Sequence, residues 1–172
     1  MGEVIYLYKG GGSMDKITYE DIADYFIAKA KESGALITNL KLQKMVYYAQ
    51  AWHITIFDEK LFDKDFQAWV HGPVLPELYD DYKQFSWKPI EREDLDVDDL
   101  KDIENKLGEQ KTEFMEELMD EYFGMNAYEL ERLTHEEEPW KKARSGLDPD
   151  EKSTNEIKTE WMEEYYSNFR EM

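Results

Sequence analysis

The chain has 172 residues, which is enough for one domain with a sizeable core but cramped for two. Its formal net charge of −19 comes from 40 Asp and Glu against 21 Lys and Arg, which disfavours direct binding to nucleic acid and favours basic protein partners. An aromatic content of 15% excludes a disordered acidic tail, and the lack of cysteine excludes disulfides, thiol nucleophiles and thiolate metal sites. No apolar run approaches the ~20 residues that span a bilayer, so we expect a cytoplasmic protein without membrane contact.

The first 13 residues differ in composition from the rest of the chain. EVIYLYK is rich in β-branched and aromatic residues and predicts a short strand, whereas GGGS is typical of a flexible linker. We therefore interpret residues 1–13 as an engineered fusion peptide with its linker, and Met14 as the natural start. On this interpretation residues 2–9 are a tethered partner peptide that occupies a groove or adds to a sheet edge. A tag or a native arm without function is the alternative.

Residues 17–34 have the periodicity of an amphipathic helix. Thr18 and Asp21 are spaced as a capping box, and Gly34 is a typical stop signal. Between them apolar residues recur every three or four positions, so that one face would pack against the core. We predict a helix over 19–32.

The segment LKLQKMVYYAQAWHI predicts a second helix, which begins at Thr38 or Asn39. Apolar and aromatic side chains cover most of its circumference, which is typical of a helix buried on several sides. We expect this helix to be central in the fold, with Lys41 and Lys44 projecting from its more polar side.

The pattern changes from helical to alternating between residues 54 and 70. Phe66, Ala68 and Val70 fall two positions apart, which predicts one or two short strands. Turn-forming residues in FDEK precede these positions, so we expect a hairpin or a small sheet here.

The stretch AWVHGPVLPELY, residues 68–79, predicts a strand, a tight turn and the start of a helix. Gly72 can adopt backbone angles that other residues avoid, Pro73 lacks an amide donor, and Pro76 suits the first turn of a helix. We interpret His71, which lies beside this turn, as a structural residue that could also contact a partner.

Residues 91–113 are rich in charge and predict one weak helix over 95–107, which Gly108 ends. We interpret this region as a solvated surface, with imitation of nucleic-acid phosphates as the alternative. An amphipathic stripe that ends at Gly124 predicts the next helix, and Asn126 is spaced to cap the one after it.

The segment LTHEEEPW contains a possible capping box formed by Thr134 and Glu137. The same helix would place Pro139 beyond its first turn, so we favour a single turn followed by a restart at Pro139. Further along, a capping box from Ser153 to Glu156 predicts a C-terminal helix. Its apolar stripe has members four residues apart: Ile157, Trp161, Tyr165 and Phe169.

The three histidines, His53, His71 and His135, raise the question of metal or hydrolytic chemistry. None has a second histidine four residues away, as a zinc-binding helix would. The glutamates that follow His135 share one turn and would point in different directions. We expect no metal, no cofactor and no catalytic residue. A metal-dependent hydrolase built from His53, His71 and His135 is the alternative.

These elements together predict a mainly α fold with a small β element, of the α+β class. We expect a compact helical domain over residues 14–150 with a short hairpin or small sheet. We expect residues 151–172 to form a C-terminal helix that either covers the domain or offers a docking surface.

Three ordered motifs resemble those of a known family. LKLQKMVYYAQAWHI, then AWVHGPVLPELY with LF before it, then LERLTHEEEPWKKAR are similar to the signatures of the Panacea antitoxin domain, also called the SocA-like or phage-associated GepA-like family. The resemblance spans roughly residues 17–144. The chain departs from the pattern at His71, where an aromatic or other residue often precedes Gly-Pro, and at Met45-Val46, where leucines are common.

The resemblance implies structural roles for the motif residues. These are Leu42, Gln43, Tyr47, Trp52, Trp69, Gly72, Pro73, Thr134, His135, Pro139 and Trp140.

The resemblance also implies a non-enzymatic antitoxin that neutralises a cognate toxin, usually by direct binding. Toxins of the family include small alarmone-synthetase-like enzymes that act on tRNA or nucleotides, and the family is associated with phage defence. A proteolytic adaptor or a phage-associated interaction module is a further alternative.

Candidate partner-binding side chains are chosen because exposed Tyr and Trp favour interfaces. They are Lys44, Tyr48, His71, Tyr79, Tyr82, Trp161 and Tyr165.

Overall fold

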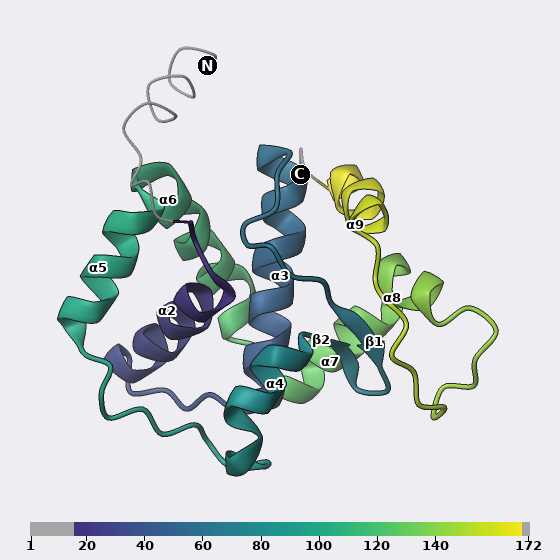
Figure 1. Ribbon diagram of the computed structural model, residues 1–172, viewed down its shortest axis with the longest axis horizontal. Helices are drawn as coiled ribbons and strands as arrows, with labels where there is room; N and C mark the ends of the chain where they lie inside the picture. The colour runs from purple at the N-terminus through teal and green to yellow at the C-terminus, as the bar shows by residue number, and fades with distance from the viewer. Residues whose placement is uncertain (1–15, 170–172) are drawn as a thin grey trace.

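Helix α3 (Asn39–Phe57) runs through the middle of the computed structural model, which describes residues 16–169 (Figure 1). On one side of α3 lie α2 (Tyr19–Glu32), α5 (Val97–Leu107) and α6 (Glu109–Leu118), the last of which continues into a π-helical turn, Met119–Phe123. On the other side lie the strands β1 (Gln67–Trp69) and β2 (Gly72–Val74) with α8 (Glu138–Ala143) and α9 (Thr159–Tyr166). The remaining elements are α4 (Pro76–Tyr82), α7 (Ala127–Glu136) and the 3₁₀ turns Lys83–Phe85 and Ser167–Phe169.

The prediction of a mainly helical fold with a small β element is confirmed. The two strands form one antiparallel hairpin, and helices make up most of the described chain. Within residues 16–169, none of the helices combines the length and the apolar character that a bilayer-spanning segment requires. The interpretation of residues 1–13 as a fusion, with a tethered peptide at 2–9, lies outside the described residues.

Local capping signals set the helix boundaries. Thr18 and Asp21 form the predicted capping box, and α2 ends at Glu32 as expected. The side chain of Thr38 accepts the amide of Lys41 at 3.2 Å and so begins α3. In the same way Asp96 and Asn126 cap α5 and α7. Because each cap spans only a few residues, the sequence alone located the caps at Thr18 and Asn126 and narrowed the start of α3 to Thr38 or Asn39. The helix predicted over 95–107 begins two residues later, at Val97, because Asp96 is its cap.

Helix α3 is surrounded on nearly all sides. It packs against α2, α4, α6, α7, α9 and β2. From Leu42 to Ala51 every side chain is buried, whether apolar or polar. The expectation of a central helix is therefore confirmed.

The hairpin acquires an additional partner from the C-terminal region. In register, Gln67 faces Val74 and Trp69 faces Gly72. On the free edge of β1, the Ala68 amide donates to the Asn155 carbonyl oxygen at 2.8 Å. The Ile157 amide likewise donates to the Phe66 carbonyl oxygen at 2.8 Å. An extended C-terminal segment thus covers the edge of the hairpin.

This edge pairing overturns two details predicted for the C-terminal region. The predicted capping box from Ser153 to Glu156 is wrong, because residues 155–157 are extended and α9 begins only at Thr159, without a side-chain cap. Ser153 Oγ instead accepts the amide of Asn155 at 3.0 Å.

The buried stripe of α9 also differs from the prediction. Met162 and Tyr166 are each 1% exposed, whereas Trp161 and Tyr165 are only half-buried and Phe169 is exposed. Since a distant strand fixes where the helix begins, the local sequence pattern could not show which face would turn inward.

Candidate functional site

The buried polar side chains of α3 bind the backbone of neighbouring segments. Gln43 is 1% exposed, and its Oε1 accepts the amide of Leu75 at 2.9 Å. Two helical turns further along, Gln50 accepts the amide of Leu61 at 2.7 Å and donates to the carbonyl oxygen of Phe62 at 2.7 Å. These hydrogen bonds satisfy buried backbone groups that have no strand or helix partner. They therefore attach two segments to α3: the loop between α3 and β1, and the step from β2 into α4.

Lys44 is fully buried beneath the hairpin turn. Its Nζ donates to the carbonyl oxygen of Pro73 at 3.1 Å. Burial lowers the pKa of Lys44 to about 7, an effect that the charge of Glu131 opposes. The expectation that Lys44 projects from a polar side of the helix is wrong, because the hairpin and α7 cover that side.

Gly72 allows this close approach of the hairpin to α3. Its φ is +110°, and a Cβ at this position would lie 2.6 Å from Lys44 Cε and 2.9 Å from Thr134 Oγ1. Both distances are shorter than a van der Waals contact, so a side chain at residue 72 would displace a buried neighbour. The Gly-Pro step is therefore required by packing as well as by backbone conformation.

Glu131 on α7 connects the two histidines of the later motifs. His71 Nδ1 lies 2.8 Å from Glu131 Oε1, and His135 Nε2 lies 3.9 Å from the same oxygen. The His135 ring stacks on Trp140 with a centroid distance of 4.0 Å, and burial lowers the pKa of His135. Trp140 Nε1 in turn donates to the carbonyl oxygen of Trp69 at 2.9 Å. The side chains thus link the hairpin to α7 and α8.

His53 lies in a different part of the fold. Its Nδ1 is 2.7 Å from the Glu59 carbonyl oxygen, and its ring packs against Phe57 and Phe114. Burial lowers the pKa of His53 to about 4, so the ring is neutral at pH 7. His53 lies nine positions after Lys44 in α3, which is about 13 Å along the helix axis. The three histidines therefore do not converge, and residues 16–169 contain no group of three or more His, Asp or Glu able to hold a metal ion.

Glu137 is the acceptor at the centre of a tyrosine cluster. Its Oε1 accepts the hydroxyl of Tyr48 at 2.7 Å and the hydroxyl of Tyr166 at 2.8 Å. Tyr47 and Tyr166 hydroxyls are 3.2 Å apart, and Tyr48 stacks on Tyr122 with ring centroids 4.1 Å apart. Burial raises the pKa of Glu137 to about 7, and the tyrosine hydrogen bonds oppose this shift. One carboxyl group thus connects α3 to α9.

Sequence reasoning missed the structural roles of three charged residues. Arg144 is 5% exposed and donates to the carbonyl oxygens of Ala68 and Asp148, each at 3.0 Å. Glu131 escaped notice, and Glu137 was assigned to a capping box, although Thr134 lies within α7. These three residues lie among many other charged residues in the sequence, and only their burial in the fold distinguishes them from those neighbours.

The family-motif residues lie at or near this polar network. Those that are buried are Leu42, Gln43, Tyr47, Gly72, Pro73, Thr134, Pro139 and Trp140. Those that are half-buried are Trp52, Trp69 and His135.

A comparison with protein families gives a match to the model described as the SocA-like antitoxin, Panacea domain, over residues 42–141. The chain belongs to this family. The match confirms the resemblance seen in the sequence and implies an antitoxin role in a toxin–antitoxin system. Proteins of the family are typically non-enzymatic. No curated protein and no solved structure matches the chain. In this Panacea domain, α2 and α9 lie outside the matched range.

Three of the side chains expected to bind a partner are buried in the Panacea domain. Lys44 and Tyr48 are each 0% exposed and Tyr82 is 6% exposed, so the prediction that they lie on the surface is wrong. Tyr82 accepts a hydrogen bond from Arg92 at 2.6 Å, and Tyr48 donates to Glu137. Lys44 and Tyr48 are buried because neighbouring elements cover their part of α3. The other candidates are exposed or partly exposed: His71, Tyr79, Trp161 and Tyr165.

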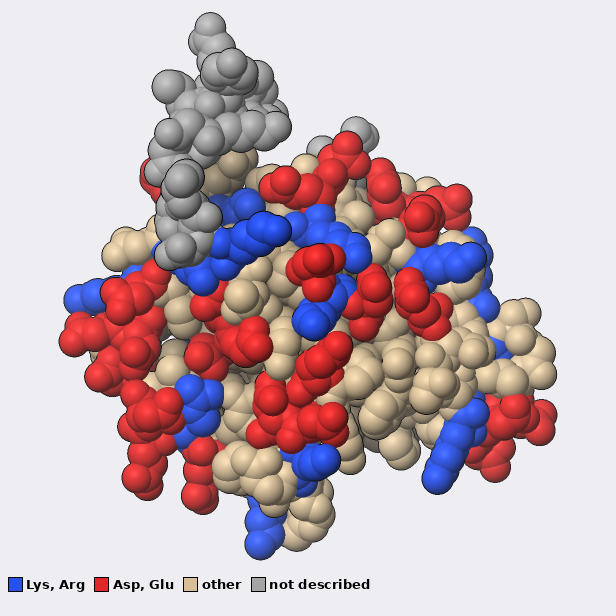
Figure 2. All heavy atoms as spheres, viewed as in Figure 1, with Lys and Arg blue, Asp and Glu red and all other residues tan. Residues whose placement is uncertain are grey.

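An aromatic pair, made of the half-buried Trp69 and the exposed Tyr79, lies on the hairpin side of the Panacea domain. The rings of Trp69 and Tyr79 lie 5.1 Å apart, and Tyr79 is 38% exposed. Val70 is half-buried and His71 is exposed at the adjoining turn. We call the surface formed by Trp69, Val70, His71 and Tyr79 the aromatic face. Figure 2 shows uncharged residues gathered where Figure 1 places the hairpin, with acidic and some basic side chains around them.

We predict that Gly72→Ala destabilises the domain by about 3 kcal/mol. About 1–2 kcal/mol comes from the positive φ and the rest from the contacts with Lys44 and Thr134. Gly34→Ala is the matched control, because Gly34 also has a positive φ of +71° but no atom within 4 Å of the added Cβ. Urea denaturation of both variants measures the difference. Equal losses in the two variants would contradict the packing role of Gly72.

We predict that Glu137→Gln removes a pH dependence from the stability. The folded-state pKa of about 7 lies above the reference value of 4.5, so the folded protein holds a proton that the unfolded chain releases. The free energy of unfolding should therefore fall as pH rises from about 4.5 to 7, by up to the order of 3 kcal/mol from this group.

Glu137→Gln cannot ionise and should lack this decline relative to the wild type. Glu138→Gln, at an exposed neighbouring position, should retain it. The measurement is chemical denaturation of the three proteins between pH 4.5 and 8. Parallel curves for wild type and Glu137→Gln would show that the buried carboxyl does not titrate in this range.

Proposed function

We propose that this Panacea domain neutralises its toxin by direct binding through the aromatic face. The observation that carries the proposal is the contrast between the inner and outer sides of the hairpin region: the inner side is packed against α3, and the outer side carries an aromatic pair. Gly72 and Pro73 hold the turn against Lys44 inside, while Trp69 and Tyr79 are paired on the outside. An aromatic surface that is held rigidly loses little entropy on binding, and exposed Trp and Tyr are frequent hot spots of interfaces.

The charge of the chain supports a basic partner. The formal net charge is −19, and Figure 2 shows more acidic than basic side chains on the face where Figure 1 places the hairpin. An acidic surface accelerates encounter with a basic one, while buried aromatic contacts prolong the complex. A toxin that acts on tRNA or nucleotides needs a basic substrate entry, and a small alarmone-synthetase-like enzyme fits this description. The binding of an antitoxin over that entry would stop the activity in the cytoplasm.

The structure offers no support for the hydrolase alternative, since His53 lies apart from His71 and His135 and each has a packing role. No feature of the described residues favours delivery of the toxin to a protease over simple occlusion. The proposal therefore commits to occlusion.

The test uses Trp69→Ala/Tyr79→Ala and the protein encoded beside this chain. We predict a loss of about 2 kcal/mol or more in binding, roughly 30-fold in Kd, because both rings become part of the buried interface. Tyr128→Ala is the control, because Tyr128 is an exposed tyrosine on α7 (66% exposed) outside the aromatic face. Calorimetry gives the affinities, thermal melting confirms folding, and growth of cells that express the toxin reports neutralisation. Full neutralisation by the folded double variant would contradict the proposal.

A further inference from the structure

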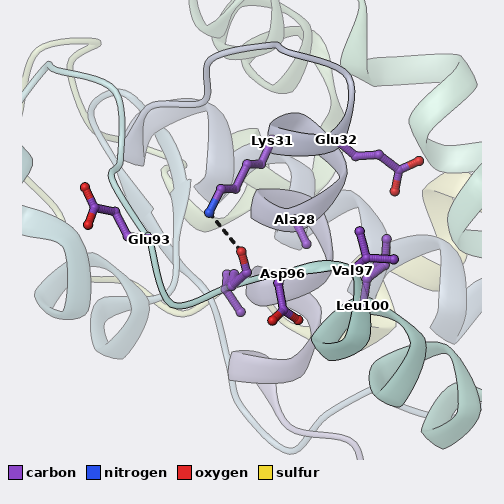
Figure 3. Close-up of a pocket in the computed structure, with 8 residues that line it drawn as sticks. Ala28, Lys31, Glu32, Glu93, Asp96, Val97 and Leu100 are labelled. Atoms are coloured by element: carbon purple, nitrogen blue, oxygen red, sulfur yellow. Dashed lines mark hydrogen bonds between the residues drawn. The ribbon is translucent and has the colours of Figure 1, made fainter.

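A pocket lies between the C-terminal end of α2 and the segment that leads into α5 (Figure 3). Figure 1 places these elements on the side of α3 opposite the hairpin. Its volume is about 310 Å³. This is the small end of the roughly 300–1,000 Å³ range of ligand pockets. A space of this size suits one long side chain better than a nucleotide or a cofactor.

Two groups of hydrogen bonds hold the pocket open. Lys31 Nζ donates to the carbonyl oxygens of Arg92 at 3.0 Å and Leu95 at 2.8 Å, which fixes the segment across the end of α2. The guanidinium of Arg92 donates to Asp24 at 2.9 Å and to Asp94 at 2.8 Å. Because both walls are tied in this way, the pocket needs little ordering on binding.

The floor of the pocket is apolar. Ala28, Leu95 and Leu100 are buried and form its inner surface. Val97, in the first turn of α5, is 58% exposed at the edge. A ligand can therefore bury apolar surface of its own against these side chains.

The rim of the pocket is acidic. Glu32, Glu93 and Asp96 are all exposed, and Figure 3 shows Glu32 and Glu93 on opposite sides of Lys31, with their carboxylates directed outward at the rim. The one cation of the lining, Lys31, has its ammonium engaged by two backbone carbonyls. Asp96 Oδ1 accepts the Asp99 amide at 3.0 Å as the cap of α5, which leaves Glu32 and Glu93 as the carboxylates directed to solvent. Three carboxylates against one ammonium give the lining an excess of negative charge, which favours a cationic ligand.

We propose that this pocket receives an arginine side chain from a basic segment of the toxin. The aliphatic stem would lie on the apolar floor, the guanidinium at the acidic rim of Glu32, Glu93 and Asp96, and an apolar neighbour of the arginine against Val97. The inference rests on the proposed function for the source of the arginine. Since the pocket and the aromatic face lie on opposite sides of α3, the arginine belongs to an extended segment of the toxin that wraps around the domain.

The first arm of the test uses a peptide and does not depend on the toxin. N-acetyl-Leu-Arg-amide, titrated at millimolar concentration, should shift the methyl NMR signals of Leu95, Val97 and Leu100, whereas N-acetyl-Leu-Glu-amide should not. Glu32→Gln/Glu93→Gln should weaken the arginine peptide about threefold to tenfold. The matched control is Glu113→Gln/Glu117→Gln, which removes the same charge from exposed positions of α6. Absence of shifts, equal shifts with both peptides, or equal weakening by both variant pairs would overturn the inference.

The second arm uses the intact toxin with the same two variant pairs. We expect Glu32→Gln/Glu93→Gln to weaken the complex about threefold to tenfold and the α6 pair to change it less than twofold. One toxin arginine, when changed to alanine, should remove the difference between the two pairs. If the toxin binds and both pairs weaken it equally, the pocket inference fails and the proposed function stands. If the toxin does not bind while the arginine peptide does, the proposed function fails and the arginine site stands.

Discussion

Hydrogen bonds from polar side chains of a buried helix to the backbone of its connections are the constraint on which this fold depends. Helix α3 is covered on nearly all sides, a position that apolar residues usually fill. A polar group buried there is costly unless it is paired, and Gln43, Lys44 and Gln50 are each paired with backbone atoms. The backbone amides and carbonyls of the irregular segments would otherwise lose their hydrogen bonds to water. Each hydrogen bond between such a side chain and a backbone group therefore offsets the desolvation cost of both groups.

The three family motifs are far apart in sequence, and in the fold they meet at this hydrogen-bonded network. The first motif supplies the buried helix, the Gly-Pro motif supplies the turn that lies against it, and the last motif supplies α7 and α8. Glu137 and Arg144 extend the same principle to the C-terminal segment, since Glu137 accepts from Tyr166 and Arg144 bonds the carbonyl oxygen of Ala68. The signature is therefore a description of how the domain is held together. The exposed residues of the aromatic face and of the pocket rim remain available for recognition.

Local signals made much of the fold predictable. The caps at Thr18 and Asn126 and the turn at Gly72 depend on neighbours in sequence, and each was located from the sequence. The C-terminal region was not predictable in this way, because residues 155–157 pair with a strand that lies far earlier in the chain. The start of α9 and its buried face follow from that pairing.

The candidate site was less predictable than the fold. Periodicity shows which side chains of a helix share a face, but it does not show how many faces are covered. Lysine is rarely buried, so Lys44 was expected on the surface although it lies beneath the hairpin. The same limit applies to Tyr48, whose burial depends on α9 and the π-helical turn. The hydrogen bond between Glu137 and Tyr166 likewise depends on contacts between segments that are distant in sequence.

Hydrogen exchange of single amides tests the central claim most directly. Gln43→Met and Gln50→Met remove the acceptors of the Leu75 and Leu61 amides with little change in side-chain shape. The account predicts that each variant loses protection at its own amide, with a fall in global stability of about 1–3 kcal/mol. Unchanged exchange at Leu61 and Leu75 in both folded variants would contradict it.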